Sequence, residues 1–256
     1  MARSEGRARR WRALVIPLLL LAALELYART QAAGSDAIAP PSAALQAWWM
    51  ALRDGSLWQA TAFTLGTAAA GLALGALLGI AAGTLLGLSR RAAAAAFLSV
   101  ELLRPIPSVA LIPLAMLVFG FGLRMELAVV AFATLWPLLV LTQAAVRQIE
   151  PRLLEVAAAL QLTRAQQFRL IVLPAMVPRL FVALRLAVAI ALVVAVTVEI
   201  AANPHGMGYA MMIAQQSLDP ALMLAWLLWI GLVGWTLNAT TLRLQQAVAR
   251  RMGGPA

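Results

Sequence analysis

Thirty-five consecutive residues of this chain, from 55 to 89, carry no charged side chain. A helix needs about 20 apolar residues to cross the hydrocarbon core of a bilayer, so this stretch is ample for one crossing. Charged residues make up only 12% of the 256 positions, against about 25% in ordinary soluble domains. Because a soluble fold of this size could not hide so much apolar surface, the sequence predicts one continuous membrane domain over residues 1–256.

The uncharged stretches predict an all-α, polytopic membrane protein with about six transmembrane helices. The expected spans cover residues 11–28, 58–88, 103–122, 125–146, 180–202 and 221–243. In the first span only the stretch from Ala13 to Leu24 is free of charge, so a second interpretation stays open there. An arginine-rich start before a short apolar run is also typical of a signal peptide, and small residues follow between Ala28 and Ala33.

Arginine supplies every positive side-chain charge, because the chain contains no lysine, and the formal net charge is +10. With six spans and both termini in the cytoplasm, including residues 1–10, fifteen arginines lie inside and three, Arg29, Arg53 and Arg124, lie outside. This bias follows the positive-inside rule. The arginines flank apolar segments and do not form one basic stripe, so we expect no nucleic-acid partner.

Missing residue types exclude several kinds of site. A nucleotide-binding loop of the form GxxxxGK[ST] needs a lysine, so this chain cannot carry that ATP site itself. Without cysteine there is no disulfide, thiol nucleophile or thiolate zinc site. The single histidine, His205, has no second histidine or cysteine to complete a metal site. We therefore expect no catalytic residue, no metal ligand and no cofactor bound by this chain.

The second expected span carries glycine at every fourth position. On a helix these residues fall near one stripe, where they let a second helix approach closely. The stripe therefore predicts a packing seam, either in a transport core or in the generic packing of a polytopic protein. Its members are Gly71, Gly75, Gly79, Gly83 and Gly87.

The third expected span opens with prolines, at Pro105, Pro107 and Pro113. Each removes a backbone donor, so we expect the start of this helix to bend or break. Such breaks survive in membranes only where they are buried in protein or line a cavity. Glu101 and Arg104 are three residues apart and can pair on one helical face at the cytoplasmic boundary.

A polar segment, residues 147–179, separates the fourth and fifth spans. It is too polar to cross a bilayer, and its Ala, Leu, Glu, Gln and Arg content favours helix. Pro151 suits the first turn of a short helix. One apolar face of this helix is expected at helical spacing, made by Leu153, Leu154, Ala157 and Leu160. Such a face indicates docking onto a soluble partner.

A turn at residues 161–163 is expected to end this first helix, and a second helix is expected from Arg164 to Val172. Pro174 and Pro178 would then mark the return of the chain into the membrane.

This segment resembles the EAA loop of permease subunits of ABC importers, whose pattern is Glu-Ala-Ala, three residues, Gly, nine residues, Ile-x-Leu-Pro. The matching positions are Glu155, Val156, Ala157, Gln161, Ile171, Leu173 and Pro174. Val156 replaces the first alanine. Gln161 replaces the glycine, which supplies a tight turn between the two helices, so Gln161 either takes that turn at some strain or the turn has another shape.

Two further segments resemble one importer subfamily, which handles nitrate, sulfonates, taurine, bicarbonate and thiamine-precursor-like solutes. Residues 102–113, reading LLRPIPSVALIP, are similar to its third span. Residues 206–209, Gly-Met-Gly-Tyr, are similar to its Gly-Leu-Gly-Tyr segment after the fifth span. Glu199 stands where that subfamily usually has a glutamate, and an intramembrane carboxylate is a candidate functional group. Pairing or helix capping at the headgroup boundary would explain Glu199 equally well.

The resemblance implies a partner for each task. Two copies of the permease would form the pathway in a bacterial inner membrane for a small anionic solute such as a sulfonate, taurine or nitrate. Two separate ATP-binding subunits would hold ATP and Mg, and an extracytoplasmic binding protein would deliver the solute. Coupling to the ATPase through residues 150–174 would involve Glu155, Ala157, Ala158, Leu160, Gln161, Leu162, Thr163, Ile171, Leu173 and Pro174. A pathway or gate role would fall to Glu199, Arg104, Pro105, Pro107 and Met207.

Two other classes of protein stay open. A non-transporting scaffold or energy-coupling subunit would share the docking helix but show no solute uptake. A membrane enzyme would need clustered Asp, His, Lys or metal ligands, and apart from Glu199 the expected spans are nearly bare of them.

Overall fold

The computed structural model describes residues 2–31 and 38–251, and all regular secondary structure within them is helical. This confirms the all-α fold class. The elements are α1 (Ala2–Thr30), α2 (Pro41–Arg53), α3 (Ser56–Leu88), α4 (Arg90–Leu103), η1 (Ser108–Leu111), α5 (Ile112–Phe119), α6 (Leu123–Arg147), α7 (Pro151–Ala159), α8 (Arg164–Gln167), η2 (Phe168–Val172), α9 (Leu173–Ala202), α10 (Gly206–Gln216) and α11 (Pro220–Arg251).

Four helical stretches within the described residues are long and apolar enough to cross a bilayer. They are α3, α6, the continuous run from Arg164 to Ala202, and α11. A fifth span follows if the bent pair of α4 with η1 and α5 crosses as one unit. The expected first span at 11–28 lies within α1, which is not among these stretches, so the count of six stays a prediction.

The third expected span, at 103–122, is not one helix. α4 ends at Leu103, and the chain bends by 84° before η1 and α5. Pro105 and Pro107 lie in the bend and cannot donate backbone hydrogen bonds, which is why the helix stops there. The break expected from the prolines is confirmed. α5 has only eight residues, about 12 Å of helix at 1.5 Å per residue, so it cannot cross a bilayer alone.

The return into the membrane differs from the sequence expectation, because the helix does not stop at Pro174. α8 runs into the π-helical turn η2 and then into α9 without interruption. In the wider π turn the Leu173 backbone N–H donates to the Phe168 carbonyl, five residues earlier. Pro174 has no backbone N–H to donate, and the π turn just before it shifts the hydrogen-bond pattern by one residue. The helix therefore continues past Pro174.

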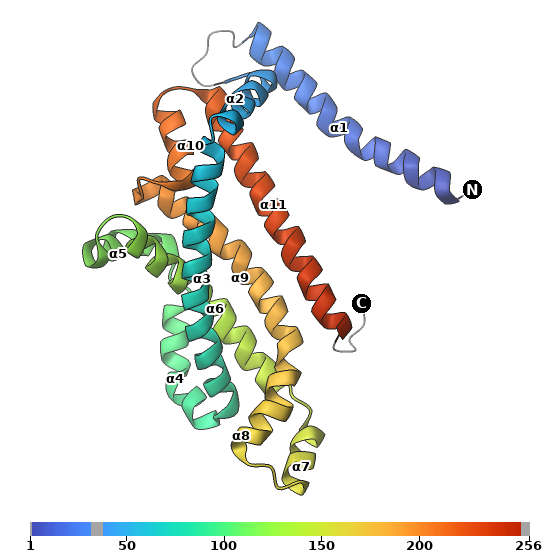
Figure 1. Ribbon diagram of the computed structural model, residues 1–256, viewed down its shortest axis with the longest axis vertical. Helices are drawn as coiled ribbons and strands as arrows, with labels where there is room; N and C mark the ends of the chain where they lie inside the picture. Colours follow the sequence, from blue (N-terminus) through green and yellow to red (C-terminus); the bar gives the residue numbers. More distant parts are fainter. Residues whose placement is uncertain (1, 32–37, 252–256) are drawn as a thin grey trace. The chain divides into compact units, whose positions relative to one another are not determined.

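By its internal packing the chain divides into two units, residues 61–209 with 232–256, and residues 1–60 with 210–231. In the first of these, α6 and α9 lie side by side (Figure 1) and hold the core. Its centre is apolar and fully enclosed, with Met125, Val129, Val130, Ala191, Ala195 and Val198 packed together. A second cluster around Val146 and Met176 joins the C-terminal end of α6 to the N-terminal part of α9.

The other unit joins α1 to α2 through polar contacts. The Ser42 hydroxyl donates to Glu25 at 2.7 Å, and Arg29 donates to the Ser42 hydroxyl at 3.0 Å. Two tryptophans pack against Trp229 of α11, with ring centroids 6.0 Å away for Trp48 and 5.5 Å away for Trp58. Tryptophan rings favour the headgroup level of a membrane, so we expect this cluster to lie in the interfacial layer.

Candidate coupling segment and membrane core

The short helix α7 presents an apolar surface with no partner among the described residues. Leu153, Val156 and Leu160 expose 41%, 52% and 66% of their surface, whereas Ala157 is buried. Glu155 and Ala158 are also exposed, and the Leu154 side chain lies outside the described residues. Of the residues expected on one apolar face, Ala157 is therefore covered by the protein, whereas Leu153 and Leu160 are exposed. A helix with exposed apolar residues is suited to lie in a groove of another protein.

Gln161 ends this helix in the left-handed conformation, with φ of +52°. Its backbone N–H donates to the Ala158 carbonyl at 3.0 Å, and the Leu162 N–H donates to the Ala157 carbonyl at 3.0 Å. These two bonds form a Schellman motif, in which the left-handed position normally holds glycine. Gln161 thus adopts the turn that glycine makes in the importer pattern, at a cost of about 1–2 kcal/mol.

Replacing Gln161 with glycine is expected to stabilise the turn by about 1 kcal/mol, because the left-handed penalty is lost while glycine adds flexibility to the unfolded chain. Valine at the same position is expected to open the turn, since a β-branched residue is least tolerant of positive φ. Hydrogen–deuterium exchange over residues 157–163 measures both effects. Slower exchange in the glycine variant and faster exchange in the valine variant are expected. Unchanged exchange in both would show that the turn carries no strain.

Thr163 starts the second short helix with a capping box. Its hydroxyl accepts from the Gln166 N–H at 3.3 Å, and its own backbone N–H donates to the Gln166 side chain at 2.9 Å. From this cap the helix continues through Ile171, Leu173 and Pro174 into α9. α7 is therefore joined by one structured turn to a membrane helix, and the end of the predicted coupling motif lies within that helix.

The five glycines of α3 all face α6 at close range. A Cβ atom added to Gly71 would lie 2.7 Å from the Val130 Cβ, and one added to Gly79 would lie 2.6 Å from the Leu135 carbonyl oxygen. Gly75, Gly83 and Gly87 meet α6 in the same way. The glycines that recur every four residues on α3 thus allow its backbone to lie close to the backbone of α6. This α3–α6 seam fixes the position of α6 in the core.

A buried polar cluster lies among α3, α6 and α9. Glu126 and Asn203 are buried, and the Asn203 amide donates to the Glu126 carboxyl group. The Thr67 hydroxyl donates to the other Glu126 oxygen at 2.5 Å. A buried carboxylate is costly unless it is hydrogen-bonded, so these contacts hold the three helices in one arrangement.

Glu199 extends this cluster toward the start of α10. It is fully buried, and its carboxylate accepts from the Gly208 backbone N–H at 2.8 Å. Met207 is also fully buried, and its N–H donates to the Thr64 hydroxyl at 2.9 Å. The structure therefore brings two of the predicted pathway residues, Glu199 and Met207, into one enclosed polar cluster.

The sequence interpretation missed Glu126, Asn203, Thr64 and Thr67. Glu126 lies at the start of the expected span 125–146, close to Arg124. A signal was present, since a carboxylate flanked by Met125 and Leu127 at a span boundary can lie either in headgroups or inside the protein. The pairing of Glu126 with Asn203, 77 positions away, depends on the packing of α6 on α9 and has no local signature.

Gly206 closes this cluster and allows a matched test. An added Cβ would lie 2.6 Å from the Glu199 Oε2 atom and closer still to the rest of that carboxyl group, at φ of +93°. Gly122 has φ of +98° but open space around it. Alanine at either position adds backbone strain of about 1–3 kcal/mol. Only Gly206→Ala also displaces Glu199, so we expect a clearly larger fall in melting temperature of the detergent-purified protein. Equal falls would mean that the carboxylate contact is unimportant.

The remaining predicted pathway residues lie apart from this cluster, at the bend after α4. Arg104, Pro105 and Pro107 are exposed there. Arg104 pairs with Glu101 at 3.5 Å, which confirms the pairing expected from their spacing. Both side chains line a cavity at the C-terminal end of α3. They do not belong to the buried cluster of Glu126 and Glu199.

The arrangement of helices matches a membrane transporter of known structure. A chain of the inward-facing MetNI methionine ABC transporter superimposes with a TM-score of 0.63 and 20% sequence identity. The match covers 78% of this chain and 96% of that chain. The fold is therefore that of an ABC transporter permease.

A sequence model of the family described as "Binding-protein-dependent transport system inner membrane component" matches residues 75–254. The chain belongs to this family. It is the membrane component of such a transport system and not an enzyme, since ATP hydrolysis takes place on a partner subunit. The family also implies a separate solute-binding protein.

Curated relatives agree with this assignment. The riboflavin transport system permease protein RibX of Chloroflexus aurantiacus is 33% identical over 94% of this chain and 91% of its own length. The bicarbonate transport system permease protein CmpB of Synechococcus elongatus is 30% identical over 78% of this chain and 72% of its own length. Permease proteins named for nitrate and taurine are also similar.

Proposed function

We propose that two copies of this chain form the translocation pathway of an ATP-driven importer for a small anionic solute, and that each copy docks an ATPase subunit through residues 150–174. The observation that supports the proposal is the exposed apolar surface of α7, made by Leu153, Val156 and Leu160. Fully burying one such side chain contributes about 1.5–3 kcal/mol, so an ATPase groove that covers all three would bind firmly.

Movement of α7 would reach the membrane core along one helix. The helix from Arg164 to Ala202 has 39 residues, about 58 Å at 1.5 Å per residue. It starts beside the docking helix and ends at Glu199 and Asn203, which hold α6 and α10. A tilt imposed by the ATPase would therefore act on the enclosed polar cluster. We propose that this cluster switches between two packing arrangements during transport.

The solute class in this proposal rests on the relatives. Permeases named for aliphatic sulfonates, bicarbonate and nitrate are similar to this chain, and these three solutes are anions. Taurine, for which another relative is named, is a zwitterion that carries an anionic sulfonate group. RibX is named for riboflavin, an uncharged flavin, and it is similar over more of the chain. Riboflavin therefore belongs in the panel that tests the anion assignment.

Reconstitution tests the proposal directly. The permease is placed in vesicles with its ATPase and binding protein, and uptake of taurine, nitrate, bicarbonate and riboflavin is measured with and without ATP. We expect ATP-dependent uptake of one anion that requires all three proteins. Uptake of riboflavin alone would overturn the solute class but not the importer. ATPase binding without uptake of any solute held by the binding protein would favour a scaffold.

A further inference from the structure

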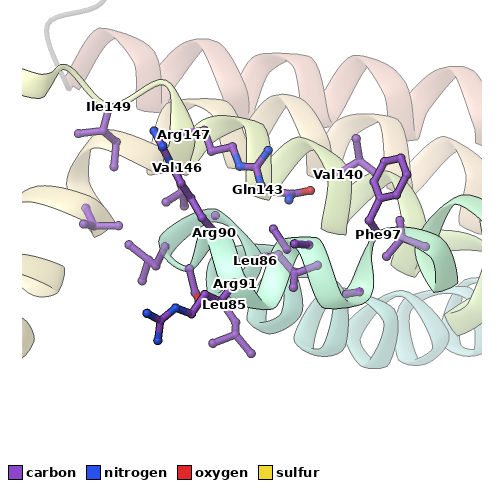
Figure 2. A pocket seen from close by; sticks show the side chains of 18 of the residues that line it. Leu85, Leu86, Arg90, Arg91, Phe97, Val140, Gln143, Val146, Arg147 and Ile149 are labelled. Carbon is purple, nitrogen blue, oxygen red and sulfur yellow. The ribbon is translucent and has the colours of Figure 1, made fainter.

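A second candidate binding site lies at the end of α3 that continues into α4. An open cavity of about 1490 Å³ is bounded by the last turn of α3, by α4, by the end of α6 and by α8 with η2. Figure 2 shows Arg90 and Arg91 at the start of α4 and Arg147 at the end of α6, beside apolar residues such as Leu86 and Val146. The cavity therefore has a basic part and an apolar part.

The basic part carries a strong excess of positive charge. Its arginines are Arg90, Arg91, Arg104, Arg147 and Arg164, and its single acidic residue is Glu101. Arg104 is paired with Glu101 at 3.5 Å. The other four arginines have no ion-pair partner among the described residues. Guanidinium groups bind phosphate and other oxyanions through paired hydrogen bonds, so the cavity is complementary to an oxyanion.

The apolar part distinguishes between small and large oxyanions. Leu85 and Phe97 line the cavity and expose 60% and 65% of their surface. Val100 and Val140 continue the apolar wall. Pockets for small ligands have volumes of about 300–1,000 Å³, so a nitrate or sulfonate would leave most of this cavity empty. A phosphate with a hydrocarbon chain attached would fill both parts.

We infer that this cavity binds an anionic phospholipid of the cytoplasmic leaflet, with the phosphate held by Arg90, Arg147 and their neighbours and an acyl chain held against Leu85 and Phe97. The inference rests on the proposed function for its orientation, which places this end of α3 and α6 in the cytoplasm. Basic pockets between membrane helices on that side are suited to acidic lipid headgroups.

Native mass spectrometry of the full-length permease tests the inference, with phosphatidylglycerol as the probe and phosphatidylcholine as the reference lipid. The cavity variant is Arg90→Ala with Arg147→Ala. Its matched control is Arg243→Ala with Arg250→Ala, which removes the same charge from exposed positions of α11. We expect wild type and control to retain phosphatidylglycerol in preference to phosphatidylcholine, and the cavity variant to bind it at least tenfold more weakly.

A second variant covers the case in which loss of two arginines unfolds the protein. Ala94 lines the cavity and is exposed, so Ala94→Asp adds a negative charge without removing any contact. It is expected to weaken phosphatidylglycerol binding while phosphatidylcholine binding stays unchanged. A competition arm adds inorganic phosphate and, separately, taurine. Neither is expected to displace the lipid.

Three results would overturn the inference. They are equal lipid binding by wild type and the cavity variants, equal loss in the cavity and control variants, and displacement of the lipid by a soluble oxyanion. The last result would assign the cavity to the solute instead. ATPase association and solute uptake are measured on the wild type in a separate experiment, so failure of the lipid site leaves the proposed importer function standing.

Discussion

Valine at Gly79 is expected to destabilise the permease strongly, whereas valine at Gly66 of the same helix is expected to leave its stability nearly unchanged. A Cβ at Gly79 would lie 2.6 Å from the Leu135 carbonyl oxygen and 3.2 Å from the Leu139 backbone nitrogen. Backbone atoms in the middle of α6 cannot move aside without opening the α3–α6 seam. Overpacking usually costs about 1–3 kcal/mol, and contact with backbone places Gly79→Val at the upper end.

Gly66 provides the control because no atom lies within 4 Å of the position its Cβ would take. Both substitutions make the same chemical change in α3, so helix propensity cancels between them. The measurement is the fraction of detergent-solubilised permease that stays monodisperse after stepwise heating. A double variant, Gly75→Val with Gly79→Val, should lose about twice as much free energy of unfolding, which reaches the lower end of the stability of a typical domain, about 5–15 kcal/mol, and should yield little folded protein. Similar melting temperatures of the Gly79 and Gly66 variants would contradict close packing of α3 on α6 at Gly79.

The parts of the fold that were predictable depend on local patterns. The uncharged stretch at 55–89 indicates a spanning helix because length and apolarity alone decide whether a segment crosses a bilayer. The prolines at 105 and 107 indicate a break because they lack a donor wherever they stand. Continuity through Pro174 was not predictable in the same way. It depends on the π turn at 168–172, and the residues of that turn carry no distinctive sequence signal.

Some residues of the candidate site could likewise be predicted from local patterns, and others could not. The α7 surface follows from helical spacing, although which residues face outward depends on where Ala157 meets the protein. The left-handed turn at Gln161 follows from comparison with a glycine pattern. Glu126 and Glu199 had to be brought together by three helices before either could be recognised as part of one cluster. Local patterns therefore predict the docking segment, while recognition of the buried polar cluster requires the packing of α3, α6 and α9.

Replacing Glu155 with arginine is expected to abolish ATP-dependent uptake and ATPase co-purification while leaving the permease folded in the membrane. Glu155 is exposed on α7, and it has no ion pair among the described residues. The permease itself therefore loses no contact. At the proposed docking surface, by contrast, we expect Glu155 to pair with a basic group of the ATPase, and breaking a buried pair costs about 3–5 kcal/mol.

The control for this substitution is Gln246→Arg, which adds a positive charge to an exposed position of α11. It should retain ATPase association and uptake. Leu160→Glu, at the exposed apolar residue that caps the C-terminus of α7, should fail in the same way as Glu155→Arg because a charge replaces apolar contact. If both α7 variants keep wild-type uptake, the ATPase does not couple through this helix. If they bind the ATPase but lose uptake, α7 transmits movement without supplying the affinity.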